Sequence, residues 1–375
     1  MANPTSSTDS STATQTNLPS LKNVSMKKSI RVVLSTCNFP EGQEKPDFIS
    51  KWLVIMRSCV FSMTIFSGII GGMFAIFTAL TAGTDILTLN WFNFLLGVIA
   101  ITLSHATNNM LNDYFDLREG VDDNEYVRAL YAPHPVLSGL ISKTKLLIVV
   151  TLLVVIFLAI TLYFFFTGYE LAITFAIFGF FLSWAYVAPP FNFKKRGLGE
   201  LSVLLVWGPL MTGVVYYVTI GKIDVFILLA TLPYAITVTT VLFGKHIDKI
   251  LPDKEKKIYT FPVIIGEKLA RRVTQVLMIS FYPLIFLLLW FQTVGIGVLL
   301  IVFALPTLYK SLKVYNKPKP DDSKEKWTGW PLYFVGWSFY HSRAAGGLFI
   351  LGLFVNIILG MVAPDFLFLQ DILGI

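Results

Sequence analysis

Residues 91–123 carry the sequence WFNFLLGVIAITLSHATNNMLNDYFDLREGVDD, in which a mainly apolar run leads into a group of acids. The run over 91–111 is long enough to cross the hydrocarbon of a bilayer, about 30 Å thick, as an α-helix. Comparable apolar runs follow one another along nearly all of the chain after Trp52. We therefore predict an all-α fold, a polytopic bundle of membrane-spanning helices.

Nine apolar runs make up the predicted bundle. With 375 residues, of which 55% are hydrophobic and only 14% are charged, the chain is far more apolar than a soluble domain. A soluble core could not bury this much apolar surface. The predicted spans cover about 53–80, 91–111, 145–166, 170–190, 201–220, 224–244, 273–292, 294–312 and 346–364.

The loops between these spans alternate between short and long, and the basic residues follow that alternation. Of the 30 Lys and Arg residues, 29 lie on the side of the N-terminus and the long loops, and only Lys222 lies opposite. Because cytoplasmic loops carry such an excess, we expect the N-terminus and the long loops in the cytoplasm and the C-terminus on the other side. The formal net charge of +7 then indicates contact with anionic lipids and not with nucleic acid.

The N-terminal region differs in composition from the rest of the chain. Residues 1–25 are rich in Ser, Thr, Asn and Pro, with almost no large apolar side chains, which predicts disorder. The following residues, 27–51, are expected to lie at the membrane interface. The predicted organisation is a leader over 1–51 and a transmembrane domain over 52–375.

The chain has two cysteines, Cys37 in the polar N-terminal region and Cys59 in the first apolar run. Their spacing matches no metal-binding or redox motif. We expect both to be unpaired thiols, buried or idle.

A first acidic cluster follows the second predicted span. If the helix continues, Asn112 and Asp116 lie one turn apart on one face, with Asp113, Asp122 and Asp123 close by. Several oxygen ligands then converge on one point, as Mg²⁺ requires. A solvated helix end, whose acids simply meet water, is the alternative interpretation.

A second acidic cluster follows the sixth predicted span, in FGKHIDKILPDKEKKIYTFPVIIG at 243–266. Asp248 and Asp253 are its acids, and the surrounding lysines are Lys245, Lys249, Lys254, Lys256 and Lys257. Acids that bind metal beside lysines that bind diphosphate oxygens would form a coherent pocket. Taken alone, a solvated loop explains this segment almost equally well, but two acidic clusters on one membrane side favour a joint metal and diphosphate site.

Both clusters resemble motifs of a known family. NDYFDLREGVDD at 112–123 is similar to the first Asp-rich motif of the UbiA superfamily of intramembrane prenyltransferases, in the form found in its menaquinone-pathway members. Asp248 and Asp253, followed by Thr260 and a Pro-containing run to Gly266, resemble the second motif.

Two further stretches agree with this resemblance, which covers about 55–365. HPVLSGLIS at 134–142 is similar to the family's Arg-Pro-Leu-x-Ser-Gly turn, and YVAPPFNFKKRGLGEL at 186–201 to its segment from Tyr-x-x-x-Pro to Arg-Gly-Leu-Gly-Glu. The chain departs from the family pattern at His134, where Arg is usual, and at Lys257, where Gly is common. The second motif also has one extra residue between its acids and no preceding Asn-Asn pair.

The resemblance implies Mg²⁺-dependent transfer of a polyprenyl group from its allylic diphosphate to an aromatic acceptor. The form of the first motif favours 1,4-dihydroxy-2-naphthoate, in quinone biosynthesis. The expected metal ligands are Asn112, Asp113, Asp116, Asp122, Asp248 and Asp253, and the expected catalytic residues are Asn112, Asp116, Asp248 and Asp253. The expected diphosphate-binding residues are Arg128, Lys143, Lys194, Lys195, Arg196 and Lys257, and those expected to contact the acceptor are His134, Arg196 and Glu200.

Other functions are compatible with this sequence. A prenyltransferase of the same type with another lipid acceptor, or a membrane terpene cyclase, would use the same metal site. A transporter would place its ionisable residues near the middle of the bilayer, whereas these acids gather at one surface. The sequence carries no signal for the oligomeric state.

Overall fold

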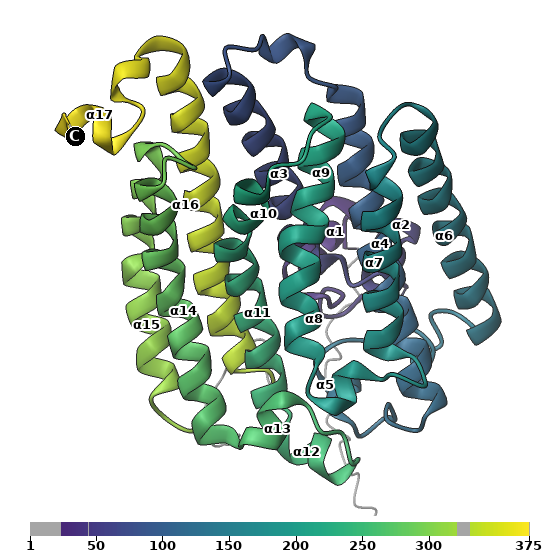
Figure 1. The fold of residues 1–375 in the computed structure, drawn as a ribbon. Coiled ribbons are helices and arrows are strands. Elements are labelled where there is room, and N and C mark those ends of the chain that lie inside the picture. The colour runs from purple at the N-terminus through teal and green to yellow at the C-terminus, as the bar shows by residue number, and fades with distance from the viewer. Residues whose placement is uncertain (1–23, 44, 321–330, 375) are drawn as a thin grey trace, which may run out of the picture.

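A computed structural model describes residues 24–43, 45–320 and 331–374. In these residues the regular secondary structure is entirely helical, with no strand. Figure 1 shows the helices side by side in a bundle, with α14, α15 and α16 on one flank and α6 on the other. The predicted all-α, polytopic fold is confirmed.

The helices before residue 225 are α1 (Met26–Thr36), α2 (Phe48–Ile55), η1 (Ser58–Val60), α3 (Phe61–Thr81), η2 (Ile86–Thr88), α4 (Trp91–Arg118), α5 (Val127–Tyr131), α6 (Lys143–Phe166), α7 (Leu171–Val187), η3 (Phe193–Arg196), α8 (Gly199–Leu205), η4 (Val206–Leu210) and α9 (Met211–Ile220). Those that follow are α10 (Val225–Ala230), α11 (Leu232–Ile247), α12 (Ile250–Glu255), α13 (Phe261–Ile265), α14 (Glu267–Trp290), η5 (Ile296–Ala304), α15 (Leu305–Tyr315), α16 (Phe334–Val362), η6 (Pro364–Phe366) and α17 (Leu369–Leu373).

Eight helical segments of the described chain are long and apolar enough to cross a membrane. The remaining predicted span, 170–190, corresponds to α7, an apolar helix of 17 residues. The largest error in the predicted boundaries is at the last span, which begins at Phe334 and not near 346. Its first turns contain Trp337, His341 and Arg343, which lower the local hydropathy although the helix continues through them.

Helix α4 also continues past its predicted end, to Arg118. The side chain of Asn90 caps its N-terminus by accepting a hydrogen bond from the backbone N–H of Asn93, at 2.9 Å. Its C-terminal turns carry the polar residues of the first acidic cluster. This extension places Asn112, Asp113 and Asp116 on a helix, while Asp122 and Asp123 follow in the loop.

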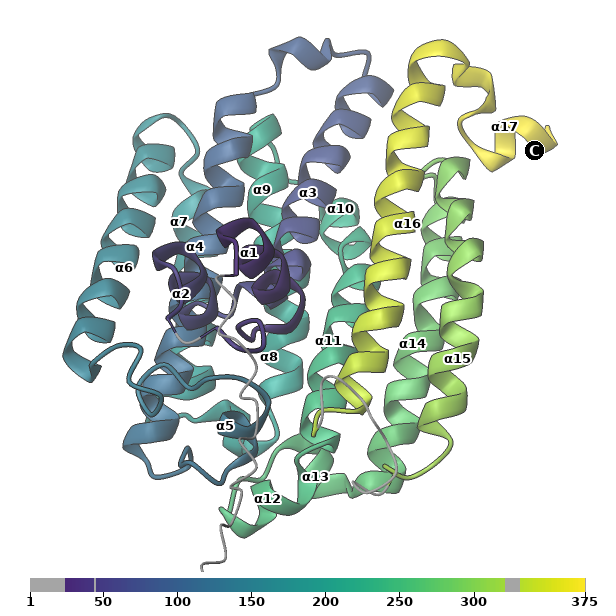
Figure 2. The same cartoon turned by 180° about the vertical axis from the view of Figure 1, so that it is seen from behind.

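The two ends of the bundle have different structures. Figures 1 and 2 place α5, α12 and α13 at one end, and the connection between α3 and α4 together with α17 at the other. The acidic segments belong to the first of these ends. Both views also place α1 and α2 against one face of the bundle.

The predicted N-terminal leader is partly helical. Helices α1 and α2 occupy most of the predicted 27–51 region, whereas the predicted disorder of 1–25 falls almost wholly outside the described residues. The prediction of unpaired thiols was wrong, because Cys37 and Cys59 form a disulfide. Cysteines separated by 22 positions meet because the end of α1 packs against η1.

Candidate metal and diphosphate site

The end of α4 places Asn112 and Asp116 one turn apart, both buried. The Asn112 Nδ2 atom donates to Asp116 Oδ2 at 3.1 Å. Beyond the helix the chain turns at Gly120, whose φ of 71° lies in the region that favours glycine. The backbone N–H of Asp122 then donates to the Asp116 carbonyl at 3.1 Å. This turn brings Asp122 back beside the end of α4.

The second acidic segment reaches the same place through Asp253 on α12. The Tyr126 hydroxyl donates to Asp253 Oδ1, and the Lys249 Nζ atom lies 3.2 Å from the same oxygen. An ion pair of 2.5 Å between Lys256 and Asp123 joins the same two segments. Segments more than 120 positions apart in the sequence are thus held together.

Three carboxylate oxygens in this region are buried without a hydrogen-bond partner among the described residues. They are both oxygens of Asp122 and the Oδ2 atom of Asp253. Burying such oxygens without donors costs free energy, which a bound cation would offset. The donor set of Asn112, Asp116, Asp122 and Asp253 consists of hard oxygen ligands and fits Mg²⁺.

Two lysines contact these acids. The Lys194 Nζ atom, on η3, lies 2.9 Å from Asn112 Oδ1 and 2.5 Å from Asp116 Oδ2. Lys249 forms a similar ion pair with Asp253. Burial lowers the pKa of Lys249, but Asp253 and Tyr126 more than offset it and hold the pKa above its ordinary value. Lys249 is therefore charged at neutral pH.

Asp113 lies beside Asp122, but its own oxygens contact two arginines. It is fully buried, and its carboxylate accepts hydrogen bonds from Arg57 and from Arg128, whose Nε atom lies at 2.9 Å. Two guanidinium groups at one carboxylate repel a divalent cation. We therefore leave Asp113 out of the metal site and Arg128 out of the diphosphate site, although both were expected there.

His134 lies beside this ion-pair cluster. One ligand atom each of Asp113, Asp122 and His134 fall within 4.8 Å of one another, close enough to hold a metal. However, His134 Nδ1 accepts the backbone N–H groups of Val136 and Leu137, both at 3.2 Å. Its proton then lies on Nε2, which is 3.3 Å from Asp122 Oδ2. This separation is an electrostatic contact and not a hydrogen bond, because neither atom has a hydrogen-bond partner among the described residues.

Asp248 has a different environment from the one expected. Its two oxygens accept the backbone N–H groups of Phe334 and Val335, at 2.9 and 3.0 Å, at the start of α16. These are N–H groups that a helix leaves without internal partners. A Cβ at Gly244 would meet the Val335 nitrogen at 2.8 Å, so glycine permits this close approach. The contacts correct the expectation for Asp248, which caps a helix.

We expect Asp248→Asn to retain turnover within about threefold, because only a helix cap is altered. Burial raises the pKa of Asp248 from 3.8 to about 7, although the two N–H donors oppose the shift. The folded protein then holds a proton that the unfolded chain releases, so the Asp248 contribution to stability falls as the pH rises from about 4 to 7. Thermal unfolding at several pH values should show a weaker dependence in the variant. A loss of turnover comparable to that of an Asp253 variant would contradict this assignment.

The remaining expected residues lie around this site. Lys195 pairs with Glu119, and the side chains of Lys143, Arg196 and Lys257 are exposed. Lys257 has a φ of 57°, in the left-handed region, which explains why glycine suits that position.

Glu200 begins α8 and is buried. Its Oε1 atom lies 2.7 Å from His246 Nδ1. Its Oε2 atom has no hydrogen-bond partner among the described residues. The structure therefore places Glu200 in a buried pair and gives no contact that assigns it to an acceptor.

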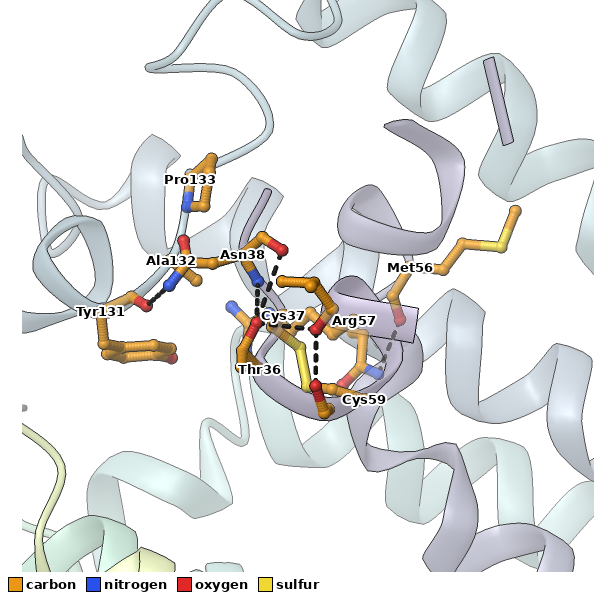
Figure 3. Close-up of a disulfide and its surroundings, with 12 residues drawn as sticks. Thr36, Cys37, Asn38, Met56, Arg57, Cys59, Tyr131, Ala132 and Pro133 are labelled. Carbon is orange, nitrogen blue, oxygen red and sulfur yellow. Dashed lines mark hydrogen bonds between the residues drawn. A yellow bond between two sulfur atoms is a disulfide. The ribbon is translucent and has the colours of Figure 1, made fainter. Parts of the chain in front are cut away.

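A cavity of about 530 Å³ extends from this end into the bundle. Asn112, Arg57, Tyr186, Trp207 and Lys245 are among its lining residues. Figure 3 shows the disulfide beside Arg57, and both cysteines also line the cavity. A more apolar chamber between α4, α6, α7 and α9 shares His105, Asn108, Ser183, Val206 and Trp207 with it. The two spaces therefore adjoin.

Four residues of this region were not predicted as site residues from the sequence. Arg57 and Tyr126 lie far from the acids that they contact, and no motif marks them. Lys245 and Lys249 stood only among the basic residues around the second cluster. The spacing of four between Lys249 and Asp253 was a usable signal, because it places both on one helical face.

The model of the UbiA prenyltransferase family matches residues 69–339. UbiA prenyltransferase domain-containing protein 1 of Danio rerio is 23% identical over 205 residues, covering 53% of this chain and 58% of that protein. The 2-carboxy-1,4-naphthoquinone phytyltransferase of Synechocystis is 29% identical over 102 residues, covering 27% and 33%. The chain spans about half the length of the curated relatives it matches first.

Solved structures share the fold. A UbiA homologue from Archaeoglobus fulgidus bound to DMAPP and Mg²⁺ matches 82% of this chain and 99% of its own, with a TM-score of 0.52 and 16% identity. A digeranylgeranylglyceryl phosphate synthase matches 81% and 98%, with a TM-score of 0.51 and 18% identity. At these identities the likeness concerns the fold alone.

Proposed function

Because the chain belongs to the UbiA prenyltransferase family, we propose that it transfers a polyprenyl group from an allylic diphosphate to an aromatic acceptor, with Mg²⁺ as cofactor. One observation carries the proposal. Both oxygens of Asp122 and the Oδ2 atom of Asp253, from two distant segments, are buried without a hydrogen-bond partner among the described residues. Contacts of Tyr126 and Lys256 join these segments, and Asn112 of the same donor set lines a cavity of about 530 Å³.

Asn112, Asp116, Asp122 and Asp253 would hold Mg²⁺. The bound ion would neutralise charge on the diphosphate leaving group and so favour cleavage of the allylic C–O bond. The A. fulgidus homologue with DMAPP and Mg²⁺ supports this expectation by its fold. Asp113 and Asp248 are not among these metal ligands, because their oxygens already accept hydrogen bonds from other groups of the chain.

Lys194 and Lys249 act beside the acids. Each ammonium group now contacts a carboxylate of the site, and a bound metal would take over part of that contact. The lysines can then donate to diphosphate oxygens, where charge develops during ionisation.

The cavity protects the allylic cation from water. Tyr186 and Trp207 line it, and aromatic faces stabilise a nearby cation. The adjoining chamber is lined by apolar side chains, among them Phe157, Phe164 and Phe175, and its volume of about 60 Å³ can hold only part of a prenyl tail.

For the acceptor we propose 1,4-dihydroxy-2-naphthoate, prenylated with loss of its carboxylate as CO₂. The support is the form of NDYFDLREGVDD and the partial likeness to the Synechocystis phytyltransferase. The residues expected to contact this acceptor are unsuited to the task. Arg196 is exposed outside the cavity lining, and His134 is occupied by backbone N–H groups.

The mass of the lipid product tests the proposed function. Purified protein is incubated with Mg²⁺, geranylgeranyl diphosphate and a panel of aromatic acids, and the products are identified by mass spectrometry. We expect a prenylated naphthalenediol that lacks the carboxylate. A hydrocarbon formed without acceptor would indicate a terpene cyclase, and a prenylated non-aromatic alcohol would indicate another lipid acceptor.

We also propose that the acidic end of the bundle faces the cytoplasm. The support is the bias of 29 of 30 basic residues. The Cys37–Cys59 disulfide favours the opposite orientation, because disulfides persist mainly in oxidising compartments.

Labelling of single cysteines decides between the two orientations. In a variant with Cys37 and Cys59 replaced by Ser, Glu125→Cys and Thr84→Cys place exposed thiols at opposite ends. We expect a membrane-impermeant maleimide added to intact cells to label only the Thr84→Cys protein. Labelling of only the Glu125→Cys protein would reverse the proposed orientation.

A further inference from the structure

Lys245 is a lysine in the cavity wall for which the proposed reaction has no role so far. It lies in the last turn of α11 and lines the cavity. Its side chain makes no hydrogen bond or ion pair with any of the described residues. Of the two other cations that line this cavity, Arg57 pairs with Asp113 and Arg343 donates to the Cys59 carbonyl. Lys194 pairs with Asp116, and Lys249 pairs with Asp253.

An amine without a partner is costly in this wall. Val238, Val241 and Leu242 of the same helix line the cavity beside Lys245. Placing a polar group among apolar side chains without a hydrogen bond is unfavourable. Such an intramembrane residue is therefore expected to meet a ligand in the cavity.

The surrounding charges determine the sign of that ligand. The charged residues that line the cavity are Arg57, Lys245 and Arg343, and no acid is among the described lining residues. This excess of positive charge attracts an anionic group. The ligand of Lys245 should therefore carry a negative oxygen.

The position along α11 distinguishes this oxygen from those of the diphosphate. Lys194 and Lys249 contact the acids of the metal site directly. Lys245 lies in the last turn of α11, whereas Lys249 lies beyond the end of that helix, in the turn before α12. Of the proposed metal ligands only Asn112 lines the cavity, and it does so together with Lys245, Asn108 and Tyr186. The amine therefore faces the space beyond the metal site.

We propose that Lys245 binds an acidic oxygen, carboxylate or phenolate, on the ring of the acceptor. The inference rests on the proposed function and names the residue that gives the site its preference for an acidic acceptor. An ion pair at this position would hold the ring beside the allylic carbon, where reacting atoms must lie about 3–3.5 Å apart. Neither Arg196 nor His134 can make this contact from its present position.

Equilibrium binding tests this role independently of turnover. The acceptor probe is 1-hydroxy-2-naphthoate, and its uncharged partner is the methyl ester. The donor probe is geranylgeranyl thiodiphosphate with Mg²⁺. Each is titrated by calorimetry into the purified full-length protein in detergent, for the unmodified protein, Lys245→Met, Lys245→Arg and the control Lys268→Met, which alters an exposed lysine on α14.

We expect Lys245→Met to weaken naphthoate binding at least tenfold and Lys245→Arg to retain most of it, with ester and thiodiphosphate binding unchanged. Lys268→Met should match the unmodified protein. Naphthoate binding unchanged in Lys245→Met would overturn the proposal, and so would a selective loss of thiodiphosphate binding, which would assign Lys245 to the donor. Failure of the unmodified protein to bind the thiodiphosphate would instead refute the proposed function.

Discussion

Asp116→Asn is expected to lower turnover by about three orders of magnitude while the protein still folds and inserts. The substitution removes a charged metal ligand but keeps the shape of the side chain and its contact with Asn112. Loss of metal-based charge stabilisation has effects of about 10²–10³ or more on rate. Turnover is measured as Mg²⁺-dependent release of diphosphate, and folding by size-exclusion chromatography and thermal unfolding.

Asp253→Asn should behave in the same way, because its oxygen reaches the site from the other segment. Glu255→Gln is the matched control, since Glu255 lies on the same helix and its side chain is exposed. It should retain turnover close to that of the unmodified protein. Turnover near the unmodified value in either aspartate variant would remove that residue from the metal site.

Asp113→Ala is expected to have the largest effect on stability. It leaves Arg57 and Arg128, both buried, without their shared carboxylate. Removing one partner of a buried ion pair costs about 3–5 kcal/mol. Thermal unfolding in detergent should therefore show a clear decrease in Tm, larger than for Asp116→Asn.

The Asp113 experiment also separates the two roles considered for this residue. If Asp113 were a metal ligand, its loss would abolish Mg²⁺-dependent binding of the thiodiphosphate while stability changed little. If Asp113 has a structural role, stability falls strongly, but any protein that remains folded still binds Mg²⁺ and the thiodiphosphate. Asp113→Asn, which conserves shape, allows this comparison if Asp113→Ala does not fold.

The fold was largely accessible from the sequence, because hydropathy alone separates membrane-spanning helices from their loops. All nine predicted spans correspond to helices. The errors arose where polar residues lie inside a span. Because of Arg343 and His341, the predicted last span began too late, although His341 is buried against Tyr282 within the bundle.

The different roles of the acids could not be predicted from the sequence in the same way. Asp113 and Asp116 stand one helical turn apart, and only the position of Arg57 and Arg128 separates their roles. Asp248 lies five residues before Asp253, yet it contacts a helix that begins 86 residues later. Such assignments depend on tertiary contacts that spacing does not encode.

Binding of geranylgeranyl thiodiphosphate with and without Mg²⁺ tests the central claim most directly, because it isolates the acidic site from the acceptor. We predict binding that requires Mg²⁺, disappears in Asp116→Asn and Asp253→Asn, and persists in Asp248→Asn. Binding of equal strength in the presence of EDTA, or binding retained in both aspartate variants, would contradict the account.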